Sequence, residues 1–339
     1  MRSHFDAVAE TDIRALIGSR WGVVLQDLHE VLEGGGAHHW SARDIDGRRW
    51  FVTCDDLATK PWLGEDHDTV FTNLLAAYTA ASDLRNAGQT SVVAPVPSRS
   101  GAPAQRLDQQ HSLAVFEHVE GTPGRWGQPL PTDAADELVA MLAGLHLAGT
   151  TRTTLANHHS LQVPGRAAFS AALAATDRRW SDGPLSETAR RILHEHLHVI
   201  THWLDDLSRV AVHLAAAGGS VVVTHGEPHP GNLIHTAHGL RLIDWDTVAL
   251  APPERDLWMI ADVDPTALEH YHEHTGTMLD PDLLAAYRLL WAVTDLAAFT
   301  AQLRAPHSGN ADDERALRGL SELLARVEPR PYGSPVDQR

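Results

Sequence analysis

The order in which strand-like and helix-like patterns follow one another most constrains the fold of this chain. Aromatic and β-branched segments that favour strands are concentrated in the first 120 residues. After a stretch of turn-forming residues at 120–127, the spacing of apolar residues becomes helical. Strands and helices do not alternate regularly, which argues against a doubly wound parallel sheet. The order predicts an α+β protein with a small β-rich lobe at 1–120, a large, mostly helical lobe at 121–330 and a tail at 331–339.

Local signals place the individual elements. Asp46-Gly47 predicts a hairpin turn, because glycine accepts a positive φ angle. Thr11 or Asp12 is expected to cap the first helix, and Gly88 to end the second. The expected helices span residues 10–20, 72–87, 132–148, 187–217, 281–304 and 312–327, and the expected strands span 23–32, 39–45, 49–54, 91–96, 112–119 and 221–224.

Composition narrows the class of protein. A hydrophobic fraction of 43% and a charged fraction of 21% are typical of a folded soluble protein. No run of about twenty uncharged apolar residues is present, so no membrane-spanning helix is expected. The N-terminal residues lack the apolar core of a signal peptide, and Cys54 is the single cysteine, so a cytoplasmic location is expected. The formal net charge of −17 argues against nucleic-acid binding. It fits a cationic substrate as well as simple solubility.

The most informative stretch lies between residues 225 and 246. It reads His225-Gly-Glu-Pro-His-Pro-Gly-Asn232 and, after a short spacer, Leu240-Arg-Leu-Ile-Asp-Trp-Asp246. Phosphoryl transfer needs a carboxylate that accepts the proton of the attacking hydroxyl group. It also needs hard oxygen ligands that hold Mg²⁺ against the phosphates. A loop with one carboxylate and one amide, followed by a strand that ends in carboxylates, can supply both.

Four residues of this stretch are the candidates for these roles. Glu227 is the candidate for the carboxylate that accepts the proton, and Asn232 supplies the amide. Asp244 follows two apolar residues and is presented from the end of a strand. Asp246 is either a further metal contact or a solvated neighbour, and the sequence leaves both interpretations open.

These motifs, in this order, resemble the aminoglycoside phosphotransferase family, whose loop reads His-Gly-Asp-x-x-x-x-Asn and is followed by Ile-Asp-Trp. Leu142-Ala-Gly-Leu-His146 and Glu254-Arg-Asp-Leu-Trp258 resemble two further elements of that family. Together the motifs cover most of the C-terminal two-thirds of the chain. The resemblance implies a protein-kinase-like bilobal fold, ATP and Mg²⁺ as cofactors, and an alcohol group as the phosphoryl acceptor.

The resemblance also implies roles for single residues. Glu227 stands in the place of the family's catalytic base, Asn232 and Asp244 match its metal ligands, and Asp256 matches an aspartate that braces the catalytic loop. The family has aspartate where this chain has Glu227, which is longer by one methylene group. Because small displacements can cost much of the rate, an inactive kinase that only binds nucleotide stays open as an alternative.

The lysine that binds the nucleotide phosphates in the family is not at its usual position in this chain. Where the family places that lysine, on the third strand, this chain has Thr53; Lys60, the only lysine, follows a few residues later. An ammonium group is a compact charge suited to phosphate oxygens, so Lys60 is expected to bind the phosphates. The alternative is a chance surface lysine. The helix expected at 72–87 has no glutamate to pair with Lys60 and offers Asp83 as a poor substitute.

Main-chain groups are the other candidates for nucleotide binding. Gly35 lies in a glycine run that places N–H groups near phosphates or forms an ordinary hairpin turn. The segment 114–119 matches the place where the family binds adenine, which implies backbone contacts from Glu117 and Val119.

The acceptor site is expected in the helical lobe. Glu254, Trp291 and Asp295 are the candidates, and the last two share a helix face, although core packing explains Trp291 equally well. The resemblance implies O-phosphorylation of a cationic antibiotic, such as an aminoglycoside or aminocyclitol, which gives resistance. A nucleoside or peptide antibiotic, or a metabolite such as choline or a sugar, stays open. A metal-dependent hydrolase is disfavoured, because the chain lacks His-Glu-x-x-His spacing.

Overall fold

The computed structural model describes residues 7–32, 37–128, 130–149, 158–217, 221–261, 264 and 266–326. The chain divides into two compact units. The first unit comprises Met1–His159 and Val221–Met278, and the second comprises Ser160–Ser220 and Leu279–Arg339. The boundary predicted near residue 120 lies inside the first unit, which holds the N-terminal sheet and the stretch 225–246 together. The tail predicted at 331–339 lies outside the described residues.

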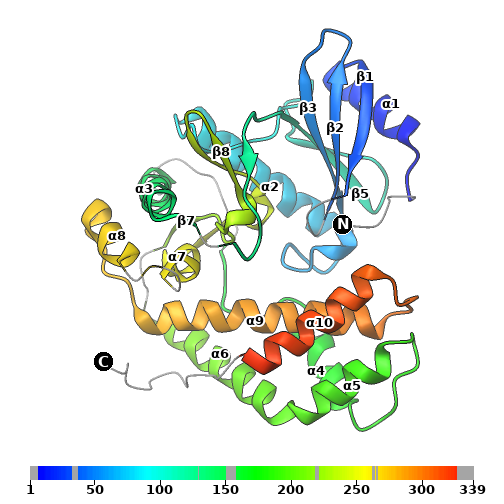
Figure 1. Cartoon of the computed structure of the whole chain (residues 1–339), viewed down its shortest axis with the longest axis vertical. Helices are drawn as coiled ribbons and strands as arrows, with labels where there is room; N and C mark the ends of the chain where they lie inside the picture. Colours follow the sequence, from blue (N-terminus) through cyan, green and yellow to red (C-terminus); the bar gives the residue numbers. More distant parts are fainter. Residues whose placement is uncertain are drawn as a thin grey trace. The chain divides into compact units, whose positions relative to one another are not determined.

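An antiparallel sheet forms the N-terminal part of the first unit (Figure 1). Its core lies on the face that packs against α1, where alternate strand residues such as Trp40, Val52 and Val115 meet Ile13 and Ile17. The strands follow the order β1 (Leu25–Val31), β2 (Ala37–Asp44), β3 (Arg49–Asp56), β5 (His111–Glu117) and β4 (Ala104–Arg106), and α1 is Glu10–Trp21.

The ends of α1 show which local signals decided its bounds. Gly22 ends the helix with a φ of 75° and donates its N–H to the carbonyl of Gly18. The prediction that Thr11 or Asp12 caps the start is wrong, since the N-cap residue is Ala9 and no side-chain hydrogen bond caps it. The helix itself begins at Glu10, as predicted, and Ile13 and Ile17 pack into the sheet core from one of its faces.

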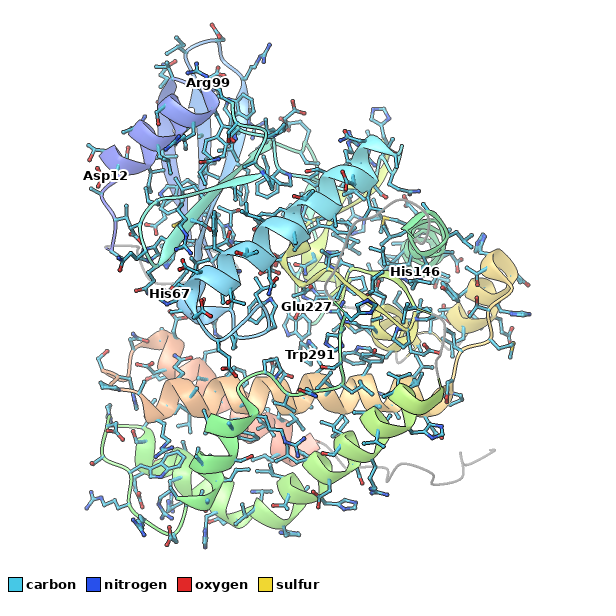
Figure 2. All side chains as sticks on the ribbon, turned by 180° about the vertical axis from the view of Figure 1, so that it is seen from behind. Asp12, His67, Arg99, His146, Glu227 and Trp291 are labelled. Atoms are coloured by element: carbon cyan, nitrogen blue, oxygen red, sulfur yellow. The ribbon has the colours of Figure 1, made fainter. Side chains whose placement is uncertain are left out.

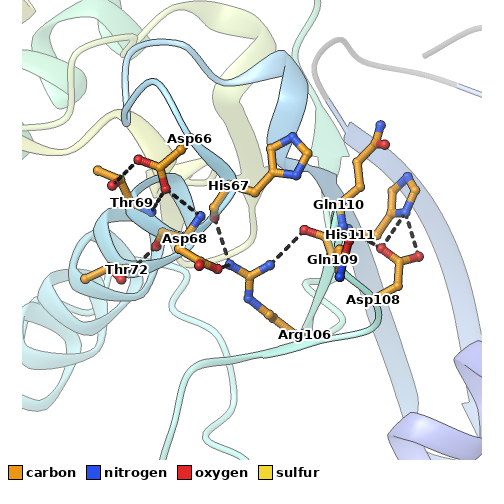
Figure 3. A network of polar contacts seen from close by, with 10 residues as sticks. All are labelled: Asp66, His67, Asp68, Thr69, Thr72, Arg106, Asp108, Gln109, Gln110 and His111. Carbon is orange, nitrogen blue, oxygen red and sulfur yellow. Dashed lines mark hydrogen bonds and ion pairs between the residues drawn. The ribbon is translucent and has the colours of Figure 1, made fainter.

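Helix α2 (His67–Asn86) begins before the predicted position 72, because Asp66 caps it by accepting hydrogen bonds from the N–H groups of Asp68 and Thr69. Arg106 of β4 holds the same helix end. Its guanidinium donates to the carbonyl of His67 at 2.8 Å and to the carboxylate of Asp68 at 2.6 Å (Figure 3). The start of α2 is therefore attached to the sheet.

The predicted strand at 91–96 is wrong. Val93 donates its N–H to Leu242, whereas Val96 donates to Val115 of β5. The segment thus crosses from one sheet to another and pairs continuously with neither. Pro95 has no N–H to donate, which also disfavours a continuous ladder.

The rest of the first unit combines short strands with helices. Helix α3 packs against α8 and α7, and β7 pairs with β10 in an antiparallel ladder. Strand β8 lies between β6 and β9. The bounds are α3 (Thr132–Gly149), α7 (Glu254–Ala261), α8 (Ala267–Thr275), β6 (Thr122–Pro123), β7 (Val222–Thr224), β8 (Leu233–Thr236), β9 (Gly239–Leu242) and β10 (Ala249–Ala251), with 3₁₀ turns at η1 (Leu57–Thr59), η2 (Pro230–Asn232) and η3 (Trp245–Thr247).

The second unit is helical in the part that the structure describes. The long helix α9 packs against α4, α5, α6 and α10. The continuous helical pattern predicted at 187–217 is broken at His196, so α5 and α6 are separate helices. The bounds are α4 (Arg166–Ala174), α5 (Ser186–Glu195), α6 (Leu197–Ala217), α9 (Pro281–Arg304) and α10 (Ala311–Arg326).

Helix α9 matches its predicted bounds. Asp280 caps it and Pro281 occupies its first turn, both of which are typical helix-start signals. By length and composition alone α9 could cross a membrane, with a mean hydropathy of 1.3 in its most apolar window. Half of that window is buried inside the protein, and the core helices of soluble proteins pass the same test.

Candidate active site

The loop after β7 is held by a chain of hydrogen bonds that starts from Arg255. The guanidinium of Arg255 donates to the hydroxyl of Thr224 at 2.7 Å and to the carbonyl of Thr247 at 2.8 Å. The hydroxyl of Thr247 in turn donates to the carbonyl of His225. Because Thr224 and Arg255 are buried, these hydrogen bonds are shielded from water and fix the path of the loop.

His225 holds the loop with both of its ring nitrogens. Nε2 lies 2.9 Å from the carbonyl of Ile243, and Nδ1 accepts the N–H of Glu227 at 3.2 Å. These partners select the neutral ring with the proton on Nε2. Burial lowers the pKa of His225 to about 4, although the charge of Asp256 opposes that shift. His225 is therefore a neutral structural residue that joins the loop to the end of β9.

Asp256 is the buried anchor of this loop. Its carboxylate accepts the N–H groups of His225 at 2.8 Å and Gly226 at 2.6 Å, and His146 of α3 lies 3.1 Å from it. Burial alone would raise its pKa, but the hydrogen bond and charge of His146 and the charge of Arg255 hold the pKa of Asp256 below its ordinary value. The contacts are those of the bracing role that the resemblance implied.

Gly226 makes the close approach to Arg255 possible. Its φ is 102°, and a Cβ atom at this position would lie 2.3 Å from the guanidinium of Arg255. A side chain would therefore displace the group that holds Thr224 and Thr247. This is the physical reason for glycine before Glu227.

Backbone and side-chain contacts bring the candidate catalytic residues together. The Nδ2 of Asn232 donates to the carbonyl of Glu227 at 3.0 Å, which leaves Oδ1 as the oxygen that can ligate a cation. The N–H of Ile243 donates to the carbonyl of Asn232 at 3.0 Å, so the residue next to Asp244 is joined to the loop. In Figure 2 the labelled Glu227 lies between α2 and α7.

Asp244 has a backbone conformation that sets it apart. Its φ of 67° makes it the one non-glycine residue with a positive φ among those that the structure describes. Asp244 keeps exposed surface, but its partial burial and the negative charges of Asp246 and Glu227 raise its pKa well above the ordinary value, against the effect of Lys60. The electrostatic environment of Asp244 thus contains several carboxylates and favours a bound cation.

Lys60 lies at the centre of a buried ion-pair cluster. Its Nζ lies 3.0 Å from Oδ1 of Asp55 and 2.5 Å from Oδ2 of Asp246, and Lys60 itself is 2% exposed. Burial alone would lower the pKa of Lys60, but Asp246 and Asp55 outweigh it and keep the ammonium charged. Asp246 is 5% exposed. The alternatives of a surface lysine and a solvated Asp246 are therefore wrong.

Lys60 does not pair with Asp83, the carboxylate that the sequence offered on α2. Its partners are Asp55 and Asp246, and α2 instead contributes Tyr78, whose hydroxyl donates to Oδ2 of Asp55 at 3.1 Å. Sequence reasoning missed Asp55 and Tyr78. A signal for Asp55 existed, because it shares a face of β3 with Thr53 and a carboxylate within a strand pattern is uncommon. No local pattern marks Tyr78.

The remaining candidates are placed as follows. Thr53 is buried on β3, and its hydroxyl lies 3.3 Å from Nδ1 of His39. Glu117 ends β5, and Val119 follows it half-buried. Glu254 is buried at the start of α7 in the first unit, whereas Trp291 and Asp295 are half-buried on α9 in the second unit. Gly35 lies outside the described residues.

The donor set fits a cation that is only partly held by protein. Across the described residues, no group of three or more His, Cys, Asp or Glu side chains is arranged to hold a metal ion. Mg²⁺ is usually bound by one or two carboxylates together with phosphate oxygens and waters. Asn232, Asp244 and Asp246 supply oxygen atoms of this kind, so the residues present fit a nucleotide-bound Mg²⁺ and not a metal site made of protein alone.

Comparison with known proteins decides the family. Residues 73–299 match the sequence profile of the phosphotransferase enzyme family. The chain belongs to this family. It is 27% identical over 299 residues to Protein StrN from Streptomyces griseus. This alignment covers 84% of this chain and 85% of StrN.

Two solved structures similar to this phosphotransferase confirm the fold. Spectinomycin phosphotransferase APH(9)-Ia, in complex with ADP and spectinomycin, matches with a TM-score of 0.69 and 16% identity, over 94% of this chain and 98% of the other. Choline kinase LicA from Streptococcus pneumoniae matches with a TM-score of 0.59 and 14% identity, over 94% and 99%. The predicted α+β, protein-kinase-like fold and the predicted family are confirmed.

The buried histidine of the loop predicts a pH dependence of stability for this phosphotransferase. The pKa of His225 falls from 6.5 to about 4 on folding. Between these two pH values the histidine is protonated in the unfolded chain but stays neutral in the folded chain. The contribution is present above pH 6.5 and is lost as the pH falls toward 4. For this residue alone the free energy of unfolding should fall by about 2 kcal/mol between roughly pH 7.5 and about pH 5.

Urea unfolding of the wild type and of His225→Gln at both pH values measures this contribution. The variant should be less stable at neutral pH, because glutamine cannot reproduce both ring contacts, but it should lose less stability on acidification. Equal losses in the two proteins would show that His225 does not titrate in this range.

Proposed function

We propose that this protein is an ATP-dependent phosphotransferase that phosphorylates a hydroxyl group of a cationic small-molecule antibiotic of the aminoglycoside or aminocyclitol class. Family membership supports the reaction type. The observation that carries the proposal is the convergence, within one compact unit, of Glu227, Asn232 and the segment of Asp244 and Asp246, with the ammonium of Lys60 on Asp246.

The proposed chemistry follows from the roles of these side chains. Glu227 accepts the proton of the acceptor hydroxyl, whose oxygen attacks the γ-phosphorus of ATP. The bond between the γ-phosphorus and the bridging oxygen breaks, and ADP leaves. Asn232, Asp244 and Asp246 would hold Mg²⁺, which would neutralise phosphate charge when bound. The loop contacts of His225 and Asp256 keep Glu227 and Asn232 in position.

Nucleotide binding is proposed to use the first unit. Glu117 and Val119 supply main-chain contacts to adenine, and Thr53 on β3 lies near the phosphates. Lys60 would bind a phosphate oxygen, because an ammonium group has three N–H donors and its contacts with Asp55 and Asp246 use two of them. The likeness to APH(9)-Ia with bound ADP supports a nucleotide in this fold.

The acceptor is proposed to be cationic. Glu254 at the start of α7 is the candidate for its recognition in the first unit, and Trp291 and Asp295 on α9 stay candidates from the sequence alone. The net charge of −17 would attract a cationic acceptor. The likeness to APH(9)-Ia with spectinomycin supports an antibiotic acceptor. The similar fold of choline kinase LicA favours a second candidate, a cationic metabolite such as choline. A cytoplasmic location and the absence of nucleic-acid or membrane partners stay predictions.

A substrate screen tests the proposal. The purified protein with Mg²⁺ and ATP is incubated with aminoglycosides, aminocyclitols, peptide and nucleoside antibiotics, choline and sugars, and ADP release is followed. Mass spectrometry should then find one phosphoryl group on the accepted compound. Nucleotide binding without transfer to any of these acceptors would instead support the inactive kinase.

Replacing Lys60 tests its role in nucleotide binding. Lys60→Ala should raise the KM for ATP roughly 10- to 100-fold, which is the effect of losing a hydrogen bond to a charged group. Lys60→Ala leaves the buried carboxylates of Asp55 and Asp246 without the ammonium, which could unfold the protein. The double variant Lys60→Met with Asp55→Asn removes one of these two negative charges and so controls for unfolding. An unchanged KM for ATP in both variants would end the idea that Lys60 binds phosphate.

A further inference from the structure

The surroundings of Lys60 contain a feature that phosphate binding alone does not explain. Asp55, Lys60 and Tyr78 are 1%, 2% and 3% exposed. The three residues come from β3, the turn after it and α2. A buried ammonium and a buried carboxylate are costly unless they are paired and hydrogen-bonded, so their close contacts are needed for this arrangement to exist.

Both oxygens of Asp55 are engaged. Oδ1 faces the ammonium of Lys60 at 3.0 Å, and Oδ2 accepts the hydroxyl of Tyr78 at 3.1 Å. A carboxylate held at both oxygens cannot rotate freely about its side-chain bond. The position of the Lys60 ammonium is therefore set by a residue that is itself fixed by α2.

Tyr78 is fixed in turn by packing and by the attachment of its helix. Its ring lies edge-on to that of Phe116 on β5, with centroids 6.1 Å apart and planes at 87°. The start of α2 is held to β4 by Arg106 (Figure 3), and α2 also packs against η3, which contains Asp246. The hydroxyl group of Tyr78 thus links the position of α2 to that of Asp55.

We propose that Tyr78 and Asp55 are positioning residues for nucleotide binding, and that they take the place of a carboxylate on α2 in orienting Lys60. Asp55 draws the ammonium toward the sheet while Asp246 draws it toward η3. Without the hydrogen bond from Tyr78, Asp55 turns away and the ammonium shifts toward Asp246. The phosphates then lose part of their contact with Lys60. This inference rests on the proposed nucleotide-binding role of Lys60.

Tyr78→Phe is the decisive variant, because it removes one hydroxyl group and keeps the ring that packs on Phe116. The dissociation constant for MgATP and the KM for ATP should rise roughly 3- to 10-fold, the effect of losing one hydrogen bond. The value of kcat should change less, since Glu227 and Asn232 are untouched. Thr79→Val is the matched control. It removes an exposed hydroxyl from the next position of α2, whose partner is the carbonyl of Leu75, and should leave nucleotide affinity unchanged.

The single lysine of the chain gives a readout that does not depend on turnover. Protein grown with [ε-¹³C]lysine has one labelled side-chain signal, that of Lys60. This signal should move when MgATP is added to the wild type. In free Tyr78→Phe it should already differ from that of the free wild type, whereas in Thr79→Val it should coincide with the wild-type signal.

The outcomes separate this inference from the proposed function. If MgATP binds the wild type and shifts the Lys60 signal, but Tyr78→Phe has wild-type affinity and the wild-type signal, the positioning role is overturned. If Tyr78→Phe only lowers the melting temperature, its role is structural and the inference again fails. If MgATP does not bind the wild type at all, the proposed function fails. Asp55→Asn should weaken MgATP binding more than Tyr78→Phe does. An equal or smaller effect would count against the positioning role of Asp55.

Discussion

Glu227→Gln is expected to lower turnover about 10²- to 10⁴-fold, which is the usual contribution of a positioned general base. Glutamine has nearly the same shape but cannot take up the proton of the acceptor hydroxyl. The backbone carbonyl of residue 227 still accepts the hydrogen bond from Asn232, so the loop should keep its form. The dissociation constant for MgATP should change little. Steady-state ADP release and direct nucleotide binding measure the two quantities separately.

Glu227→Asp is the matched comparison. Aspartate stands at this position in the family that the sequence resembles, but here the loop is built around a side chain longer by one methylene group. We expect a smaller loss of turnover than in Glu227→Gln, on the order of tenfold, because the carboxylate is kept but displaced. Turnover by Glu227→Gln close to that of the wild type would show that the base lies elsewhere.

Asp256→Asn is expected to cause the largest loss of stability, about 3 to 5 kcal/mol, as for a buried pair that loses one partner. The carboxylate accepts two backbone N–H groups of the loop and contacts His146. An asparagine side chain has one acceptor oxygen and would turn its NH₂ group toward one of these donors. Turnover should fall as well, since Glu227 directly follows the two residues that Asp256 holds.

Asp136→Asn is a matched control for this change. Asp136 also accepts a contact from a histidine, with His270 Nδ1 at 2.8 Å, but its side chain is 48% exposed. Exposed pairs contribute about 0 to 1 kcal/mol, so the control should be nearly neutral in urea unfolding and in turnover. Equal effects of the two changes would contradict the anchoring role of Asp256.

Much of the loop at 225–232 could be predicted from the sequence because its candidate functional residues are close together along the chain. The hydrogen bond from Asn232 to Glu227 spans five residues, and the pair of strands β8 and β9 that leads to Asp244 follows directly. Because these residues lie within one short loop, the type and spacing of its polar residues indicate its chemistry. The bounds of α9 were predictable for the same local reason, since Asp280 and Pro281 mark its start.

Other elements were not predictable, because distant contacts decided them. The segment at 91–96 has strand-forming residues, yet it is divided between Leu242 and Val115 and forms no ladder. The helical pattern at 187–217 continues through His196, but the structure breaks it there. In both cases the packing of separate elements overrode a local preference that is small per residue.

The sequence by itself determined the fold class, the family resemblance and the identity of Glu227, Asn232 and Asp244 as a candidate set. Only the tertiary structure decided what surrounds Lys60: it joined this residue to Asp246, 186 positions away, and to Asp55 and Tyr78. The physical reason is that spacing along one element shows which face a side chain occupies. The partner of a buried charge, by contrast, is set by how separate elements pack, because every charge removed from water must find its counterpart there.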